Sequence, residues 1–158
     1  MNNNSEYMDT DYDEIPVDEW ILLFADRMNA GQALKVSPRG FSMYPLLVGK
    51  RDDIILGKPD TPLKRGDICM FRRDNGVYVL HTIHHKDGVS YFFVGESQTK
   101  IEGPIREDQI VARAQGFVRN GKAYSCNNFL FRVIHELWLR LRVFRPMLIR
   151  SYRFVRRI

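Results

Sequence analysis

Residues 67–94 read DICMFRRDNGVYVLHTIHHKDGVSYFFV, which is three mostly apolar runs separated by Asn75-Gly76 and Asp87-Gly88. Both dipeptides accept the positive φ angles that tight hairpin turns require. The runs have the length and the alternation of strands that bury one face. This stretch therefore predicts two consecutive β-hairpins with antiparallel pairing.

The same pattern continues on both sides of this stretch. Short apolar runs separated by turn residues extend over residues 34–124, and a third turn dipeptide occurs at Asn120-Gly121. The fold class is therefore mainly β, of the α+β kind because helical patterns flank the strands. We predict strands at 34–37, 53–56, 67–72, 77–84, 90–94 and 110–118.

A helix is predicted before the first strand. Pro16 suits a first helical turn, Gly31 is a natural stop, and apolar residues recur between them at helical spacing. The chain then divides into three parts. We expect a disordered acidic tail over residues 1–15, a β domain with a leading helix over residues 16–125, and a basic amphipathic helical tail over residues 126–158.

The helical tail has a strongly basic composition. From residue 129 onward it holds eight arginines and one acidic residue, Glu136, and Pro146 should interrupt the helix. Such a tail favours an anionic partner or surface. Either its apolar residues, such as Phe129, Leu137 and Trp138, enter an anionic membrane surface, or the same stripe packs on the β domain. DNA is disfavoured because no readout motif accompanies the basic face.

Size and composition fit one globular core. The chain has 158 residues, 44% of them hydrophobic and 27% charged, which excludes a disordered or fibrous class. Its N-terminal 26 residues hold eight acids and neither Lys nor Arg, unlike a signal peptide. No stretch approaches the roughly 20 apolar residues that cross a bilayer. We expect a cytoplasmic protein, or one peripheral at the inner face of the cell membrane, with Cys69 and Cys126 as reduced core thiols.

The string Gly40-Phe41-Ser42-Met43-Tyr44-Pro45 is the first candidate for chemistry. Gly40 permits a close backbone approach and Pro45 fixes the turn, so that Ser42 is presented at the end of a strand. Taken alone, an ordinary turn serine explains the string more simply. A serine hydroxyl becomes an effective nucleophile only when a neighbouring base removes its proton. The sequence must therefore supply that base.

His81 is the candidate base. It lies inside the predicted strand 77–84, where alternation places it on one face with apolar neighbours. A hydrogen-bonded core histidine fits the same position, and periodicity does not decide between the two. His84 and His85 stand beside a turn, where we expect them in solvent. Their spacing does not suit a shared metal site on one strand face.

Four elements together resemble a known family. They are Gly-Phe-Ser-Met-Tyr-Pro at 40–45, Leu-Lys-Arg-Gly-Asp-Ile at 63–68, Val-Leu-His-Thr-Ile at 79–83 and Gly-Glu-Ser at 95–97. Over about residues 36–118 the chain resembles the signal peptidase I and LexA-type serine peptidases. It is most similar to the small bacterial members that lack an N-terminal membrane anchor and carry His where bacterial signal peptidases use Lys.

The resemblance implies a serine endopeptidase that cleaves a peptide or precursor protein through an acyl-enzyme. Ser42 takes the nucleophile role and His81 the base role, and no metal or cofactor is required. The implied fold is a coiled, antiparallel, β-barrel-like sheet that binds an extended peptide by strand addition. The residues that would shape the substrate and oxyanion side of the nucleophile turn are Gly40, Phe41, Met43 and Pro45.

Two motifs depart from the family pattern. Thr82 stands where the family usually has Arg after the base, and Glu96-Ser97 stand where it has Asp-Asn. The changed motif leaves open a noncatalytic peptide-binding module with the same fold. A self-cleaving LexA-type regulator is the third alternative. It is disfavoured because the residues before the peptidase region offer one helix and no helix-turn-helix for DNA.

Overall fold

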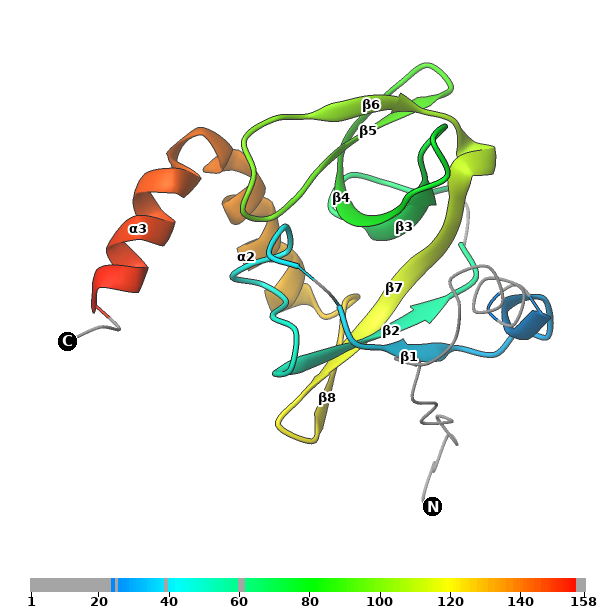
Figure 1. Cartoon of the computed structure of the whole chain (residues 1–158), viewed down its shortest axis with the longest axis horizontal. Helices are drawn as coiled ribbons and strands as arrows, with labels where there is room; N and C mark the ends of the chain where they lie inside the picture. The colour runs from blue at the N-terminus through cyan, green and yellow to red at the C-terminus, as the bar shows by residue number, and fades with distance from the viewer. Residues whose placement is uncertain (1–23, 25, 39, 60–61, 156–158) are drawn as a thin grey trace.

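The computed structural model describes residues 24, 26–38, 40–59 and 62–155. Their main feature is an eight-stranded antiparallel sheet in which β7 joins two halves, one of β1 and β2 and one of β3 to β6 (Figure 1). The strand order is β1-β2-β7-β3-β4-β5-β6, and β8 pairs with β7 outside this path. The mainly β architecture with added helices is therefore confirmed. Within the described residues the path has two ends, so the sheet is open rather than closed.

All six predicted strands are present, and only their ends differ. Two further strands, β6 and β8, were missed by the sequence analysis, because Gly103-Pro104 interrupts the strand pattern of β6 and every residue of β8 is exposed. The strands are β1 (Leu34–Val36), β2 (Asp52–Gly57), β3 (Ile68–Arg72), β4 (Tyr78–Asp87), β5 (Ser90–Val94), β6 (Glu102–Ile105), β7 (Ile110–Arg119) and β8 (Lys122–Ser125).

The three turn dipeptides lie where the sequence predicts them. Asn75-Gly76 connects β3 to β4, Asp87-Gly88 connects β4 to β5, and Asn120-Gly121 connects β7 to β8, each pair being antiparallel. The glycines and Asn120 have positive φ angles between 51° and 86°. Tight turns with these angles set the register of each hairpin.

Two apolar clusters form the core, one for each half of the sheet. The first packs Phe24 and Met28 against β1, β2 and β7, and the second lies within β3 to β6 around Phe71 and Phe93. Phe24 and Met28 belong to the predicted leading helix, of which residues 24 and 26–29 are helical. Gly31, with φ of 74°, follows its end as predicted. The rest of that helix and the predicted acidic tail lie outside the described residues.

The C-terminal part consists of α2 (Phe129–Arg140), the short 3-10 helix η2 (Arg142–Phe144) and α3 (Arg145–Val155). Another 3-10 helix, η1 (Glu107–Gln109), leads into β7. The Asn128 side chain accepts a hydrogen bond from the Phe131 N–H and caps the start of α2. The chain bends at η2, and Pro146 occupies the first turn of α3, where proline is tolerated.

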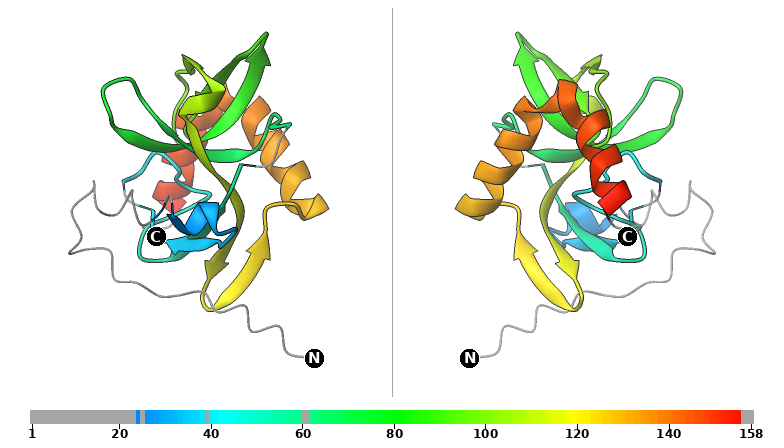
Figure 2. Two further views of the ribbon diagram at one scale, coloured as in Figure 1. Left: turned by 90° about the vertical axis from the view of Figure 1, so that its right-hand side faces the viewer. Right: turned by 90° about the vertical axis from the view of Figure 1, so that its left-hand side faces the viewer.

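Helices α2 and α3 lie together on one side of the sheet, which faces the viewer in the right panel of Figure 2. No helix among the described residues is long and apolar enough to cross a membrane.

Candidate active site

Ser42 lies in the loop between β1 and β2, half-buried, in a tight turn. The turn forms because Gly40 has φ of 79°, a conformation that glycine adopts without strain. The Tyr44 N–H then donates to the Phe41 carbonyl at 3.1 Å, and the Leu47 N–H donates to the Met43 carbonyl at 2.8 Å. The presentation of Ser42 on a turn after a strand is therefore as expected.

The other predicted residues of this turn differ in their environments. Met43 is 4% exposed and belongs to the first apolar cluster, so it anchors the turn to the core. Phe41 is 74% exposed, which leaves its ring available to a ligand. Pro45 is half-buried, and its carbonyl accepts a hydrogen bond from Arg51 at 3.2 Å.

The segment that follows β5 holds the turn that contains Ser42. The Ser97 N–H donates to the Ser42 carbonyl at 2.9 Å, and the Ser97 hydroxyl donates to the Phe41 carbonyl at 2.8 Å. A Cβ atom added to Gly95 would lie 2.8 Å from the Ser42 carbonyl oxygen. This position therefore needs glycine, since only a residue without Cβ allows so close an approach.

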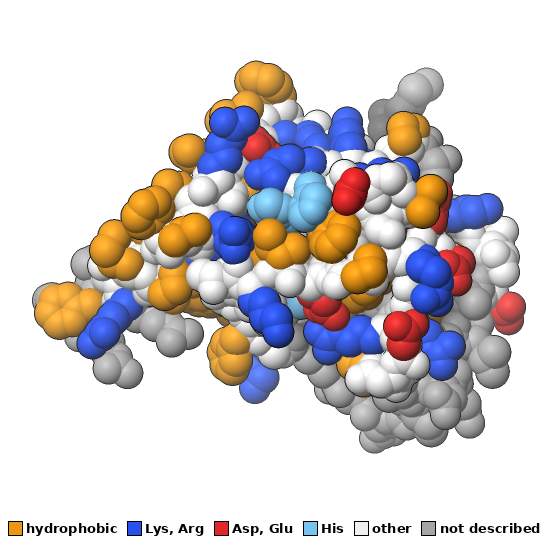
Figure 3. All heavy atoms as spheres, turned by 90° about the horizontal axis from the view of Figure 1, so that it is seen from above, with side chains coloured by type: hydrophobic (Ala, Val, Ile, Leu, Met, Phe, Trp, Pro, Cys, Tyr) orange, Lys and Arg blue, Asp and Glu red, His pale blue; other side chains and the backbone are white. Residues whose placement is uncertain are grey.

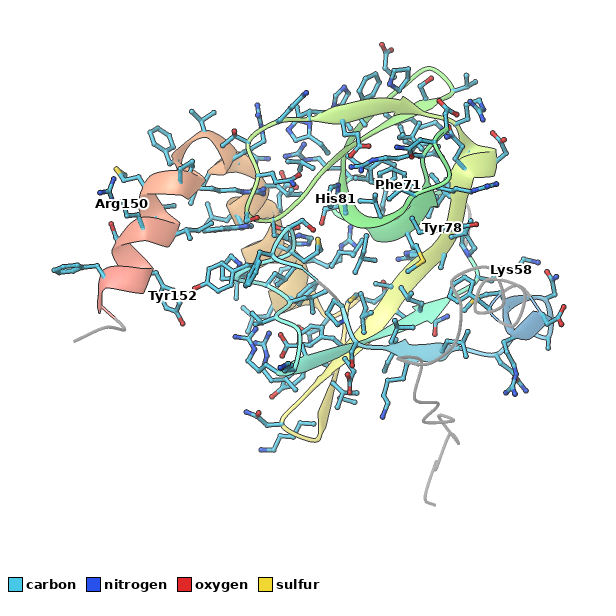
Figure 4. All side chains as sticks on the ribbon, viewed as in Figure 1. Lys58, Phe71, Tyr78, His81, Arg150 and Tyr152 are labelled. Atoms are coloured by element: carbon cyan, nitrogen blue, oxygen red, sulfur yellow. The ribbon has the colours of Figure 1, made fainter. Side chains whose placement is uncertain are left out.

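His81 is buried inside β4, with 2% of its surface exposed, and lies beside Phe71 at a ring-centroid distance of 6.2 Å (Figure 4). Its Nδ1 atom is 3.6 Å from the Glu102 carboxylate, too long for a hydrogen bond. Within the described residues this buried Nδ1 has no hydrogen-bond partner. Burial lowers the pKa of His81 to about 4, although Glu102 acts in the opposite direction. The imidazole is therefore neutral at pH 7 and can accept a proton.

Ser42 and His81 lie on segments that meet at Gly95. His81 directly precedes Thr82, Thr82 pairs with Val94, and Gly95 directly follows Val94. The Ser42 carbonyl packs on the same Gly95. Among the described residues, no hydrogen bond joins the Ser42 hydroxyl to the His81 imidazole. Catalytic hydrogen bonds often form only when substrate is bound.

Glu102 is the carboxylate that faces His81, and the sequence analysis did not identify it. The Arg73 guanidinium donates to Glu102 at 2.8 Å, and this hydrogen bond lowers the pKa of Glu102. Glu102 begins β6, which ends the sheet path beside a cleft of about 690 Å³. Ser97 and Glu102 both line this cleft, so it adjoins the neighbours of Ser42 and of His81. Its lining residues are Arg73, Ser97, Gln98, Thr99, Lys100, Ile101, Glu102, Gly103 and Pro146.

Glu96 belongs to a buried polar cluster that the sequence analysis also missed. Its carboxylate accepts hydrogen bonds from the Thr82 hydroxyl and, at 2.8 Å, from His135 Nε2, and it lies 3.6 Å from Arg145. Glu96 and Arg145 are fully buried. Burial opposes ionisation of Glu96, but the hydrogen bonds from His135 and Thr82 prevail and lower its pKa. The cluster therefore holds a buried negative charge that is compensated by its partners.

This cluster connects the C-terminal helices to the segment that holds Ser42. Arg145 donates to the Gly95 carbonyl at 2.7 Å and to the Gln98 carbonyl at 3.1 Å, while the Trp138 indole donates to the Glu96 carbonyl at 3.1 Å. The two departures from the family pattern, Thr82 and Glu96, thus contact each other directly. No local sequence signal pairs them with residues about 40 to 60 positions away, so only the fold reveals the cluster.

His84 and His85 contact each other, and both cysteines are buried. A bulge between Ile83 and His85 interrupts the alternation of β4, and the Nδ1 atoms of His84 and His85 lie 2.9 Å apart. The described residues contain no group of three or more His, Cys, Asp or Glu arranged to hold a metal ion. Cys69 and Cys126 are buried and unbridged, as expected, and burial raises the pKa of Cys126 to about 12.

Comparisons of the chain with protein-family models, with curated proteins and with solved structures found no match.

Proposed function

We propose that the protein is a serine endopeptidase of the signal peptidase and LexA type, with Ser42 as nucleophile and His81 as general base. The observation that carries the proposal is that Gly95 stands at the junction of both segments: the Ser42 carbonyl packs on it, and His81 lies across from it at the end of the β4–β5 pair. The resemblance of the four sequence elements supports the same assignment. The mainly antiparallel β sheet also supports it, although the implied fold is barrel-like and the described sheet is open.

The proposed reaction uses the neutral imidazole of His81. Because Nδ1 faces Glu102, Nε2 is the atom that takes the proton from the Ser42 hydroxyl as its oxygen attacks the peptide carbonyl carbon. The Ser42 N–H, which donates no hydrogen bond within the described residues, would stabilise the oxyanion. The C–N bond then breaks as Nε2 returns the proton to the leaving amine. Water attacks the acyl-enzyme with His81 again as base, which releases the acid and restores Ser42.

The substrate of this proposal is an extended peptide. Strand β6 is one end of the sheet path and lies beside the cleft that Ser97 and Glu102 line. An edge strand offers backbone hydrogen bonds to an added strand, and this mode of recognition needs no particular side chains. Exposed Phe41 would contact side chains of the bound peptide near the nucleophile.

The test is covalent labelling of the full chain with a fluorophosphonate, followed by peptide mass spectrometry. We expect one adduct, on Ser42, that is absent from Ser42→Ala and strongly reduced in His81→Ala. Ser125→Ala, which removes an exposed hydroxyl of β8, is the matched control and should label like the unmodified chain. An adduct that persists in Ser42→Ala would contradict the proposed nucleophile.

The second candidate is a noncatalytic peptide-binding module. The lack of a Ser42–His81 hydrogen bond among the described residues and the engagement of Glu96 by Thr82 and His135 favour it over a self-cleaving regulator. A module would bind extended peptides but give no fluorophosphonate adduct at any pH. The labelling experiment therefore separates the two candidates.

A further inference from the structure

Helix α2 packs a mixed side on the β domain, where Leu139 is buried and Phe131 packs against the first apolar cluster, and it turns a row of large apolar side chains outward. His135 is buried, and Glu136 pairs with Arg65 at 3.0 Å across the contact. Trp138 also lies against the domain, although its sequence pattern groups it with the apolar stripe. The outward residues recur at positions i, i+1, i+4, i+5 and i+8, and each is 49% to 82% exposed: Phe129, Leu130, Val133, Ile134 and Leu137.

The apolar surface continues beyond α2. Four side chains on η2 and α3 are 56% to 67% exposed, namely Val143, Phe144, Met147 and Phe154. We call these four, with the five outward residues of α2, the helical apolar surface. Figure 3 shows hydrophobic and basic side chains interspersed over this end of the molecule. Soluble monomers rarely expose so many large apolar side chains together, so we expect a partner to cover this surface.

The charge around the surface indicates the nature of that partner. From residue 129 onward the sequence has eight arginines and one acid, and that acid, Glu136, pairs with Arg65 and Arg140. Three of the eight arginines are bound to the β domain: Arg145 is buried, Arg132 pairs with Asp67, and Arg142 donates to the Thr99 carbonyl. Arg140 and Arg150 are exposed, and Arg150 points away from the β domain in Figure 4. A second copy of this chain would bring two such basic helices together, which like-charge repulsion disfavours.

We propose that α2 and α3 bind in the plane of an anionic phospholipid surface, with the helical apolar surface inserted among the acyl chains and the arginines at the headgroups. Helices that carry large apolar side chains together with arginines bind at the lipid–water interface. Each basic residue near anionic headgroups adds to the attraction. This inference is independent of the peptidase proposal, because it rests on no residue of the Ser42 and His81 site.

Vesicle flotation of the full chain tests the inference. We expect binding to vesicles of phosphatidylcholine with phosphatidylglycerol, and much weaker binding to vesicles of phosphatidylcholine alone. The double variant Leu137→Glu, Phe144→Glu should bind at least about tenfold more weakly, because two large apolar side chains no longer enter the bilayer and two negative charges are brought to the anionic headgroups. Val89→Glu, at a site 84% exposed in the β4–β5 turn, is the matched control and should bind like the unmodified chain.

Circular dichroism should show that the double variant keeps its fold, because both substituted side chains are exposed. Should it unfold, Arg140→Gln with Arg150→Gln provides the second test, with weaker binding to anionic vesicles expected. Two results would overturn the inference. One is the absence of binding to anionic vesicles by the unmodified chain, and the other is equal binding by the control and the variants. Dimers that dissociate in Leu137→Glu, without vesicle binding, would instead identify a second copy as the partner.

Discussion

Gly95 is the residue on which the geometry of the proposed site depends most directly. In Gly95→Ala the new Cβ would lie 2.8 Å from the Ser42 carbonyl oxygen, so the nucleophile turn must move away. We expect fluorophosphonate labelling of Ser42 to slow by about tenfold or more, since small displacements of reacting groups are costly. Gly121→Ala is the control. It introduces strain at φ of 74° with no atom within 4 Å, and should leave labelling unchanged.

Glu102 is expected to set the basicity of His81. Its carboxylate raises the pKa of His81 against the effect of burial, so Glu102→Gln should lower that pKa further. An NMR titration of the His81 imidazole in both chains measures the difference. A pKa that stays the same or rises in Glu102→Gln would show that the carboxylate does not act on the imidazole.

Single residues differ in how far the sequence predicts their role. Alternation along β4 correctly predicts that His81 shares its face with apolar side chains, because side-chain direction is a local property of a strand. Glu102 and His135 could not be found in this way, since their partners come from other strands or helices. The bulge in β4 likewise brings His84 and His85 together against the expected alternation.

Among the elements, the contact between the C-terminal helices and the Gly95–Gln98 segment depends on Arg145. Arg145→Met removes a buried guanidinium and leaves the Glu96 charge and three backbone carbonyls without that partner. We expect the free energy of unfolding to fall by about 3 kcal/mol, the usual scale for breaking a buried charged pair. Urea unfolding measures this value, with exposed Arg150→Met as the control. A loss below about 1 kcal/mol would mean that Arg145 is dispensable.

The elements themselves were predicted best where turn chemistry and periodicity agree. The hairpins of β3 to β5 follow from their turn dipeptides, whereas β8 pairs with β7 through exposed residues that carry no alternating pattern. The amphipathic pattern of α2 predicts a helix but not the direction of its faces. The buried cluster around Glu96 binds His135 and Trp138, and this orientation of α2 leaves the apolar row from Phe129 to Leu137 outward.

For the whole molecule, buried His81 predicts a loss of stability in acid. The pKa of His81 in the folded chain is about 4, below the ordinary value of 6.5. Between pH 4 and pH 6.5 the unfolded chain therefore binds a proton that the folded chain does not bind. Stability from this group is complete above pH 6.5 and is lost as the pH falls toward 4. The loss reaches up to about 3 kcal/mol. Urea unfolding at pH 7 and pH 4.5 should show a smaller pH difference in His81→Gln, and an unchanged difference would contradict the assignment.

The overall architecture could be predicted as mainly β with flanking helices, because these patterns are local. The open path of the sheet, and the cleft beside β6, depend on how distant strands meet and do not follow from any one segment.

The most direct measurement is the rate at which Ser42 is acylated by a fluorophosphonate between pH 3.5 and pH 9. For the unmodified chain we predict that reactivity declines in acid with a midpoint near pH 4, where His81 gains its proton. In His81→Ala the rate at neutral pH should fall by about 100-fold or more, the usual contribution of a general base. Equal rates in the two chains across this range would contradict proton transfer from Ser42 to His81.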